Sequence, residues 1–364
     1  YAEREAVVSI HQQVRFTYSQ LAERVNKLAK AFISAGFQKG DRIGIWSPNN
    51  VQWLITQYAT AKAGLILVTI NPAYRSHELA YVLRQSGCKG LVLQNKFRSS
   101  NYEQMLCELC PELPNVSTGK LLSIEYEQLT TIISTTESSA SGIYSWAEFN
   151  DLSNDSSDQD LDARLNGQDM DDPINIQYTS GTTGFPKGAT LSHHNILNNG
   201  YFVAETMNFD ESDRLVVPVP LYHCFGMVMA NLGCLTHGAC VVYPSEAFEP
   251  EAVLHAVQSE RATALYGVPT MFIAELALPN FSEYDLKTLR TGIMAGAPCP
   301  VDTMTQVNER MNMTEVEIAY GMTETSPVSF QTRVDSPVEK RVSTVGKVHP
   351  HVEVKIINPD TNKL

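Results

Sequence analysis

Hydrophobic and polar positions alternate with helical and strand periods near the start of the chain. Thr17 and Gln20 form a capping box that is typical of a helix start. Leu21, Val25 and Leu28 then recur at helical spacing. The elements expected next are the strand RIGIWSPN, a helix over 51–62, the strand LILVTINP, a helix over 77–85 and the strand GLVLQ. Strands that alternate with helices predict a parallel sheet covered by helices.

This periodicity is lost between about residues 114 and 172, where Ser, Thr, Asn and Asp predominate. From Asp151 to Asp172 there are eight Asp and one Arg, so the segment holds over half of the net negative charge of the chain. Low apolar content with dense like charge is typical of solvated chain. We therefore expect a surface loop or insertion over 114–172.

A second alternating region follows the acidic stretch. Its expected elements are the strand INIQY, a helix from His193, the strand LVVPVP, a helix from Met227 to Cys234, the strand ACVVY, a helix over 250–260, the strands ATALY and LRTGIMAG, a helix from Thr303 to Met311 and the strand EVEIAY. The run HVEVKIIN, close to Leu364, is also typical of a strand. The whole pattern predicts an α/β fold of two related subdomains, residues 1–172 and 173–364, with parallel or mixed sheets covered by helices.

Composition and charge narrow the class of partner. The 364 residues are 43% hydrophobic and carry a formal net charge of −13, and no run rich in Lys and Arg offsets it, so nucleic acid is not an expected partner. Residues 215–245 contain no Asp, Glu, Lys or Arg, but Pro218 and Pro220 interrupt them. We expect buried core there and no transmembrane segment. The seven cysteines have no repeated spacing, which favours a reducing compartment over a disulfide framework.

Candidate chemistry is concentrated between Tyr178 and Gly188, in the string YTSGTTGFPKG. Its glycines let backbone amides turn toward an anion, its hydroxyls donate hydrogen bonds to phosphate oxygens, and Lys187 adds a positive charge. A Walker A loop needs Ser or Thr directly after its Lys, whereas Gly188 follows Lys187 here. The string therefore predicts a phosphate-binding loop of another kind.

Five further motifs follow this loop. They are His193-x-Asn195, PLYHCFGM at 220–227, YGVPT at 266–270, GAPCP at 296–300 and YGMTE at 320–324. In this order and spacing, and together with the phosphate loop, they make the chain resemble the AMP-forming acyl-CoA synthetases of the adenylate-forming superfamily. The resemblance covers nearly the whole chain, and TSGTTGFPKGATLSHHNILNN is most similar to mitochondrial medium-chain members. One departure is Ala319, where the family more often has Gly.

The resemblance implies that a fatty carboxylate attacks ATP to give acyl-AMP and that CoA then displaces AMP. It assigns the phosphates of ATP to Thr179, Ser180, Gly181, Thr182, Thr183, Gly184, Phe185, Pro186 and Lys187. It assigns Mg²⁺ to Glu324 with Thr182 or Thr183, and the α-phosphate to Thr323. A carboxylate beside hydroxyls suits Mg²⁺, which takes oxygen ligands and keeps water and substrate phosphates. The expected catalytic residues are Lys187, His223, Thr323 and Glu324.

The resemblance also implies the sites of adenine and acyl chain. The adenine is expected between two walls. Tyr320, with Gly321 and Met322 after it, forms one wall, and Gly296, Ala297 and Pro298 form the opposite one. His223 is expected to position the carboxylate, although a lone histidine in an apolar run is by itself more typical of a core residue. The acyl pocket is expected to be lined by His223, Phe225, Met227, Tyr266, Val268 and Thr270.

The expected function is a fatty acid CoA ligase, with a mitochondrial matrix location implied by the resemblance alone. Related enzymes continue beyond the position of Leu364 with a ribose-binding aspartate, a hinge and a small domain that carries a lysine. We therefore expect a truncated chain with little activity by itself. Two alternatives stay open: a non-catalytic nucleotide-binding or interaction protein, and an adenylating enzyme that passes the acyl group to another acceptor.

Overall fold

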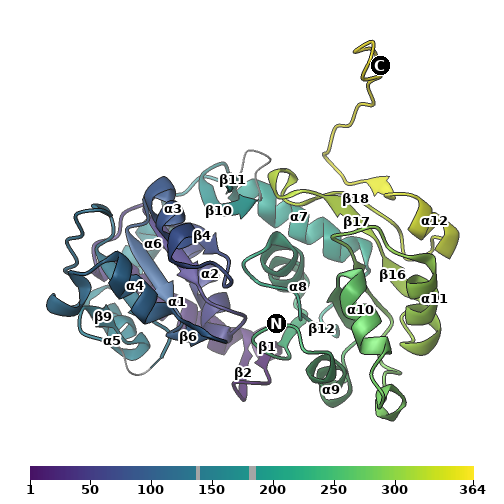
Figure 1. Ribbon diagram of the computed structural model, residues 1–364, viewed down its shortest axis with the longest axis horizontal. Coiled ribbons are helices and arrows are strands. Elements are labelled where there is room, and N and C mark those ends of the chain that lie inside the picture. The colour runs from purple at the N-terminus through teal and green to yellow at the C-terminus, as the bar shows by residue number, and fades with distance from the viewer. Residues whose placement is uncertain (137–139, 180–185) are drawn as a thin grey trace.

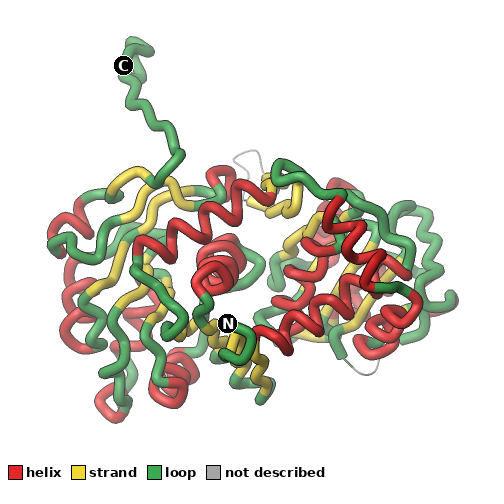
Figure 2. The backbone as a smooth tube through the Cα atoms, turned by 180° about the vertical axis from the view of Figure 1, so that it is seen from behind, coloured by secondary structure: helices red, strands yellow, loops and turns green. Residues whose placement is uncertain are grey.

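The computed structural model describes residues 1–136, 140–179 and 186–364. Two seven-stranded sheets and the helices around them form its elongated body (Figures 1 and 2). Helices cover both faces of each sheet, as expected for strands whose buried residues point to both sides. The α/β fold with parallel and mixed sheets is therefore confirmed.

The first sheet has the strand order β16–β15–β14–β12–β13–β1–β2. Its strands are β1 (Glu5–Ser9), β2 (Val14–Thr17), β12 (Arg214–Val216), β13 (Cys240–Tyr243), β14 (Ala264–Gly267), β15 (Thr291–Met294) and β16 (Glu315–Glu317). Every neighbouring pair is parallel except β1 and β2, which are antiparallel. The N-terminal strands therefore complete a sheet whose other strands come from the second half of the chain.

The second sheet has the strand order β11–β10–β4–β3–β5–β8–β9. Its strands are β3 (Arg42–Trp46), β4 (Ile66–Ile70), β5 (Gly90–Leu93), β8 (Thr131–Ser134), β9 (Ile143–Tyr144), β10 (Pro173–Thr179) and β11 (Lys187–Ser192). All its neighbours are parallel except β10 and β11, which pair antiparallel with Thr179 opposite Lys187. The predicted phosphate loop thus connects two paired strands at one edge of this sheet.

Helices form three layers around the two sheets. The helices are α1 (Tyr18–Ser34), α2 (Val51–Lys62), α3 (Ser76–Ser86), α4 (Tyr102–Leu109), α5 (Trp146–Asp151), α6 (Asp158–Asn166), α7 (His193–Thr206), α8 (Gly233–His237), α9 (Pro250–Glu260), α10 (Pro269–Leu276), α11 (Val301–Arg310) and α12 (Val338–Ser343). Short helical turns are η1 (Leu113–Asn115), η2 (Leu152–Asp155), η4 (Phe281–Glu283) and η5 (Thr323–Thr325), and η3 (Phe225–Leu232) is a π-helix.

The apolar core has three parts that follow these layers. The central part lies between the two sheets and includes α1, α2, α7 and η3. The outer parts lie between the second sheet and α3 and α4, and between the first sheet and α9, α10 and α11. In the described ranges, every helix is too short or too polar to span a bilayer.

The two sheets do not follow the predicted division of the chain at residue 172. Residues 5–17 join the sheet of the second half, and residues 173–192 join the sheet of the first half. Local periodicity cannot show this exchange, because strand pairing depends on contacts far apart in the sequence. As a boundary between domains, the division at 172 remains a prediction.

The acidic stretch is an ordered part of the fold where the structure describes it, so the expected surface loop over 114–172 is corrected. It contains β8, β9, α5, η2 and α6, and Phe149 and Leu161 are buried in the central core. Lys27 binds Asp151 at 2.9 Å and Lys30 binds Asp158 at 3.0 Å, which holds the acidic segment against α1. Exposed pairs of this kind contribute little individually, so the buried apolar residues carry most of the attachment.

The C-terminal part differs from expectation. EVEIAY divides into β16 and β17 (Ala319–Gly321), and β17 joins β18 (Val328–Gln331) and β19 (Lys347–Val348) in an antiparallel sheet. A further two-stranded pair is β6 (Lys96–Phe97) with β7 (Ser100–Asn101). The expected strand HVEVKIIN is not a strand, because this stretch extends from the body without a pairing partner among the described residues (Figures 1 and 2).

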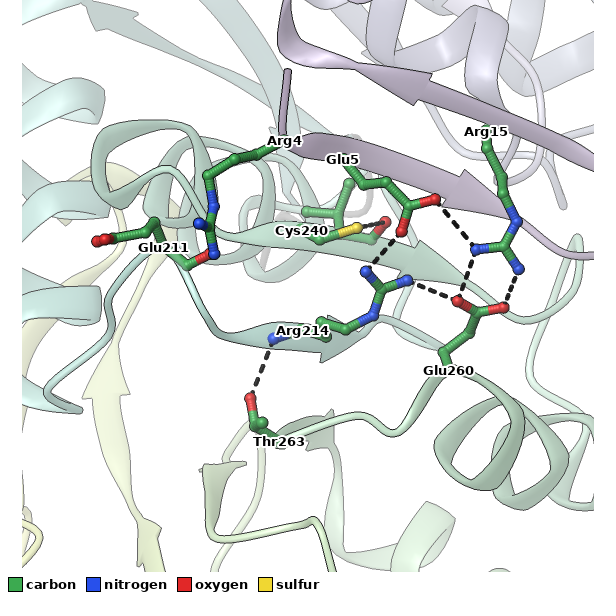
Figure 3. A network of polar contacts seen from close by, with 9 residues as sticks. Arg4, Glu5, Arg15, Glu211, Arg214, Cys240, Glu260 and Thr263 are labelled. Carbon is green, nitrogen blue, oxygen red and sulfur yellow. Dashed lines mark hydrogen bonds and ion pairs between the residues drawn. The ribbon is translucent and has the colours of Figure 1, made fainter. Parts of the chain in front are cut away.

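An ion-pair network attaches the N-terminal hairpin to the first sheet (Figure 3). Arg214 of β12 binds Glu5 at 2.7 Å and Glu260 at 2.5 Å, and Arg15 of β2 also binds Glu260. Burial opposes ionisation of the nearly buried Glu260, but hydrogen bonds from both arginines outweigh it and lower its pKa. The network joins residues more than 200 positions apart and fixes the edge of the sheet.

Candidate active site

A central cavity of about 780 Å³ opens where strands of both sheets end. Asn71 follows β4, Thr179 ends β10, and Gly296 lies just beyond β15. Parallel strands place their carboxyl ends at one edge of a sheet, and this is where α/β proteins bind ligands. The described lining residues are Asn71, Tyr74, Tyr178, Thr179, Pro186, Tyr222, His223, Cys224, Phe225, Met229, Ala295, Gly296, Ala319, Gly321, Met322, Thr323, Glu324, Pro327 and Val328.

Many of the residues expected at the site from the sequence lie on this cavity. The described ones are Thr179, Pro186, His223, Phe225, Gly296, Gly321, Met322, Thr323 and Glu324. Ser180, Gly181, Thr182, Thr183, Gly184 and Phe185 lie outside the described residues. Lys187 begins β11 directly after Pro186, and it is exposed beside the cavity lining. The structure therefore brings both ends of the predicted phosphate loop to the cavity that holds Glu324.

The Thr323–Glu324 pair stands on a tight turn. The side-chain hydroxyl of Thr325 donates to the carbonyl oxygen of Pro327 at 2.6 Å, and the amide of Met322 donates to that hydroxyl at 3.2 Å. A Cβ atom on Gly321 would lie 1.8 Å from the carbonyl oxygen of Pro327. The close approach of these two backbone segments therefore requires glycine at position 321. The turn leaves Glu324 exposed and buries Thr323.

His223 is a neutral hydrogen-bonding group in this structure. Its Nδ1 accepts from the backbone amide of Phe225 at 3.1 Å, so the ring proton belongs on Nε2. Although His223 is partly open to the cavity, desolvation by the protein around the ring lowers its pKa, which favours the neutral ring. A neutral imidazole that keeps one N–H can donate to a carboxylate, and this agrees with a positioning role.

Cys224 is the thiol that lies beside these groups. Its Sγ lies 3.6 Å from Nδ1 of His223 and 3.8 Å from the Thr323 hydroxyl oxygen. Burial raises the pKa of the Cys224 thiol to about 12. The thiol therefore stays protonated at neutral pH and lacks the thiolate that a nucleophile needs.

Only some of the predicted adenine residues are part of the cavity lining. Gly296 has a positive φ of 86° and lines the cavity, whereas Ala297 and Pro298 are exposed beyond it. Tyr320 lies beside the cavity lining, is 49% exposed and packs edge-on against Phe330, with 6.0 Å between ring centroids. An exposed aromatic face next to a glycine turn offers a surface on which a flat ring can stack.

The predicted acyl pocket is only partly assembled. His223 and Phe225 line the central cavity and Met227 lines another cavity; Val268 is not in the lining, but its Cγ1 lies 3.2 Å from where a Cβ atom on the lining residue Gly296 would be, and Thr270 is exposed. Tyr266 is fully buried behind Phe225, with 5.3 Å between ring centroids, and its hydroxyl donates to the carbonyl oxygen of Met229 at 3.4 Å. An apolar run cannot by itself show which residues face a cavity and which fill the core.

Ten described lining residues were not among the predicted site residues: Asn71, Tyr74, Tyr178, Tyr222, Cys224, Met229, Ala295, Ala319, Pro327 and Val328. Asn71 directly follows a buried strand, and a polar residue at that position is a signal that could have been used. Tyr81 of α3 supports the same side, because its hydroxyl donates to the carbonyl oxygen of Pro186 at 3.0 Å.

Metal binding here depends on more than side chains. Among the described residues, no group of three or more His, Cys, Asp or Glu is placed to hold an ion, and Glu324 is the only carboxylate that lines the central cavity. Mg²⁺ commonly uses one or two carboxylates and completes its octahedron with water and phosphate oxygens. The donor set therefore fits Mg²⁺ that arrives with a nucleotide.

Comparison with known proteins gives consistent matches over the whole chain. The model of the AMP-binding enzyme family matches residues 1–364. The putative acyl-CoA synthetase YngI of Bacillus subtilis is 46% identical over 361 residues, which are 99% of this chain and 66% of the relative. The medium-chain acyl-CoA ligase ACSF2, mitochondrial, of Macaca fascicularis is 42% identical over 369 residues, which are 100% of this chain and 59% of the relative.

Solved structures show the same fold. The N-terminal domain of FACL13 from Mycobacterium tuberculosis has a TM-score of 0.81 and 22% identity, covering 98% of this chain and 81% of that one. The anthranilate CoA ligase AuaEII in complex with anthranoyl-AMP has a TM-score of 0.85 and 23% identity, covering 100% and 65%. The chain spans less than two thirds of the length of the curated relatives named above.

Proposed function

Because the chain belongs to the AMP-binding enzyme family, whose model matches residues 1–364, we propose that it is the ATP-binding portion of an acyl-CoA ligase for medium-chain fatty acids. The observation that carries the proposal is the central cavity, where both ends of the Thr179–Lys187 segment meet the Thr323–Glu324 turn. The names of YngI and ACSF2 support the reaction class, and the name of ACSF2 supports the chain length. That name also supports a mitochondrial location.

In the proposed reaction the protein positions charge on the nucleotide. The segment from Thr179 to Lys187 holds the β- and γ-phosphates, and Thr323 contacts the α-phosphate. Glu324 holds Mg²⁺, which when bound would neutralise charge on phosphate oxygens. His223 donates its Nε2–H to the fatty carboxylate and aims one carboxylate oxygen at the α-phosphorus. The bond from that phosphorus to pyrophosphate breaks, and the CoA thiol later displaces AMP from the acyl carbon.

The proposal includes slow turnover by this chain alone. No Lys or Arg occurs among the described residues that line the central cavity, and Lys187 lies beside them on an exposed strand. Stabilising the charge of a transition state by one fixed donor is typically worth about 100-fold to 1,000-fold in rate. Nucleotide binding is therefore a better first measurement than turnover.

Calorimetric titration with MgATP tests the proposed site. We expect Glu324→Ala and Lys187→Ala each to weaken binding at least about tenfold, since each removes a charged contact to the triphosphate. Glu309→Ala and Lys287→Ala remove the same charges from exposed positions away from the cavity and should bind as the wild type does. Equal affinities in all five proteins would contradict the proposal.

Exchange of labelled pyrophosphate into ATP with octanoate separates an enzyme from a protein that only binds nucleotide. Octanoate-dependent exchange that is lost in Glu324→Ala supports the ligase. MgATP binding without any detectable exchange, even after long incubation, would favour the non-catalytic alternative over the slow ligase. Release of AMP that depends on CoA distinguishes the thiol from another acyl acceptor.

A further inference from the structure

A second cavity of about 300 Å³ lies between α1, α2 and α7, and we call it the side groove. Its wall is aliphatic and includes Leu21, Val25, Ile196 and Leu232. The described residues that line it are all different from those that line the central cavity. The side groove is therefore not an extension of the proposed active site.

The π-helix η3 separates the two cavities. Phe225 and Met229 face the central cavity, whereas Met227 and Leu232 face the side groove. The Gln57 amide donates to the carbonyl oxygen of Met227 at 3.0 Å, which ties η3 to α2. Unusual π-helical turns often occur at functional sites, and this one supplies a wall to two cavities at once.

Most polar groups along the side groove are already bonded to the protein. The Tyr18 hydroxyl donates to the carbonyl oxygen of Ala239 at 2.7 Å, and the Tyr58 hydroxyl donates to that of Asn231 at 2.9 Å. The Gln57 carbonyl oxygen accepts from the Asn231 amide at 2.8 Å. The Oδ1 of the lining residue Asn175 has no partner among the described residues; apart from this oxygen, a ligand in the middle of the groove would meet mostly hydrocarbon.

The charge at the groove has one sign. None of the described residues that line it is Asp or Glu, and Lys62, the last residue of α2, supplies a positive charge; burial lowers the pKa of His193, the first residue of α7, so its neutral ring offers an N–H donor. The Lys62 ammonium donates to the neutral Asn26 amide oxygen at 2.7 Å. Asp172, which acts on His193, is itself paired with Lys39 at 2.6 Å. An apolar groove with one lysine and one imidazole donor at helix ends complements a chain that carries one negative charge.

We propose that the side groove binds an aliphatic monocarboxylate. The hydrocarbon lies along Leu21, Val25 and Leu232, and the carboxylate meets Lys62 and His193. Small-molecule sites usually measure about 300–1,000 Å³, so this groove suits a chain of medium length and not a nucleotide. The proposal does not depend on the proposed function, because the two cavities share no described residue.

Octanoate titrated by calorimetry tests the proposal, with the central cavity filled by the stable adenylate analogue 5′-O-(N-octanoylsulfamoyl)adenosine. Ala22 is exposed on α1 and lines the groove, so Ala22→Trp fills the space without disturbing the core. We expect wild type to bind octanoate and Ala22→Trp to bind it at least about tenfold more weakly. Lys62→Gln should weaken binding up to about fivefold, the range of a partly exposed charge pair, and Lys287→Gln is the matched control.

Two outcomes would overturn the side-groove proposal. One is octanoate binding that is absent from wild type or unchanged by Ala22→Trp in a protein whose circular dichroism shows it to be folded. The other is that octanol binds as tightly as octanoate and that Lys62→Gln has no effect. This result would show that the groove does not recognise the carboxylate. Binding of the adenylate analogue, measured separately, reports on the central cavity, so failure of the proposed function is distinguishable from failure here.

Discussion

At the scale of single residues, His223 illustrates how context changes the role of a side chain. Its sequence surroundings are apolar and by themselves typical of a core histidine. The structure instead puts it on the cavity lining, with Nδ1 occupied by the Phe225 amide and a lowered pKa caused by desolvation. A fixed tautomer gives the ring one defined donor, which a positioning residue needs.

Glu275 gives a prediction at the same scale. This carboxyl group of α10 is fully buried, one of its oxygens has no hydrogen-bond partner among the described residues, and burial raises its pKa well above the ordinary value. The folded protein therefore keeps the group protonated, while the unfolded chain ionises it once pH exceeds the ordinary glutamate pKa. Stability supplied by the protonated group is full below that pH and is lost as pH rises toward the raised value.

Glu275→Gln should remove this pH dependence. The variant stays neutral at every pH, so we expect it to be more stable than wild type at pH 8, because the unfolded wild-type chain gains free energy by ionising Glu275, at about 1.4 kcal/mol per pH unit between the two pKa values. The difference should shrink toward zero near pH 4. Urea unfolding of both proteins at the two pH values measures it, and a constant difference would refute the argument.

At the scale of elements, the turn between β17 and β18 links fold and site. Gly321 passes so close to Pro327 that an added Cβ atom would lie 1.8 Å from its carbonyl oxygen. The backbone of the turn sets the direction of Thr323 and Glu324. The sequence showed the YGMTE motif, but the need for glycine at position 321 is visible only once β17 is paired with β18.

Gly321→Ala should therefore damage nucleotide binding through the backbone. The two strands must separate to admit the methyl group, which costs about 1–3 kcal/mol and displaces Glu324. We expect MgATP affinity to fall at least about tenfold in a folded protein. Gly167→Ala is the matched control, because a Cβ atom there lies no nearer than 3.3 Å to the Ala163 carbonyl oxygen. Equal affinity for both variants would show that the turn does not orient the site.

At the scale of the whole molecule, periodicity predicted most helices and strands but not their partners. The helix over 51–62 and the capping box at Thr17 were confirmed, because the burial of one helix face and local hydrogen bonds depend on residues that are close in the sequence. The exchange of β1 and β10 between the sheets was not predicted, since it depends on distant pairing. The segment over 114–172 was wrongly expected to be a loop, because its apolar residues are sparse, although several of them, such as Ile132, Phe149 and Leu161, are buried in the core.

In the candidate site, too, short motifs could be predicted from the sequence, whereas features that depend on distant packing could not. Motif residues such as Thr179, Gly296 and Thr323 lie together on the central cavity, as the resemblance implied. The acyl pocket remains a prediction: of its expected residues, Tyr266 fills the core and Met227 faces the side groove in this structure. Which side of a buried segment is hollow depends on how whole layers pack, and no single motif contains that information.

The most direct measurement of the central claim is a crystal structure of this chain with Mg²⁺ and a non-hydrolysable ATP analogue. The account predicts that the β- and γ-phosphates lie between the Thr179–Lys187 segment and Glu324, with the metal bound to that carboxylate. It also predicts the adenine between Gly296 and Tyr320. A nucleotide bound elsewhere, or phosphates out of reach of both Lys187 and Glu324, would contradict the account.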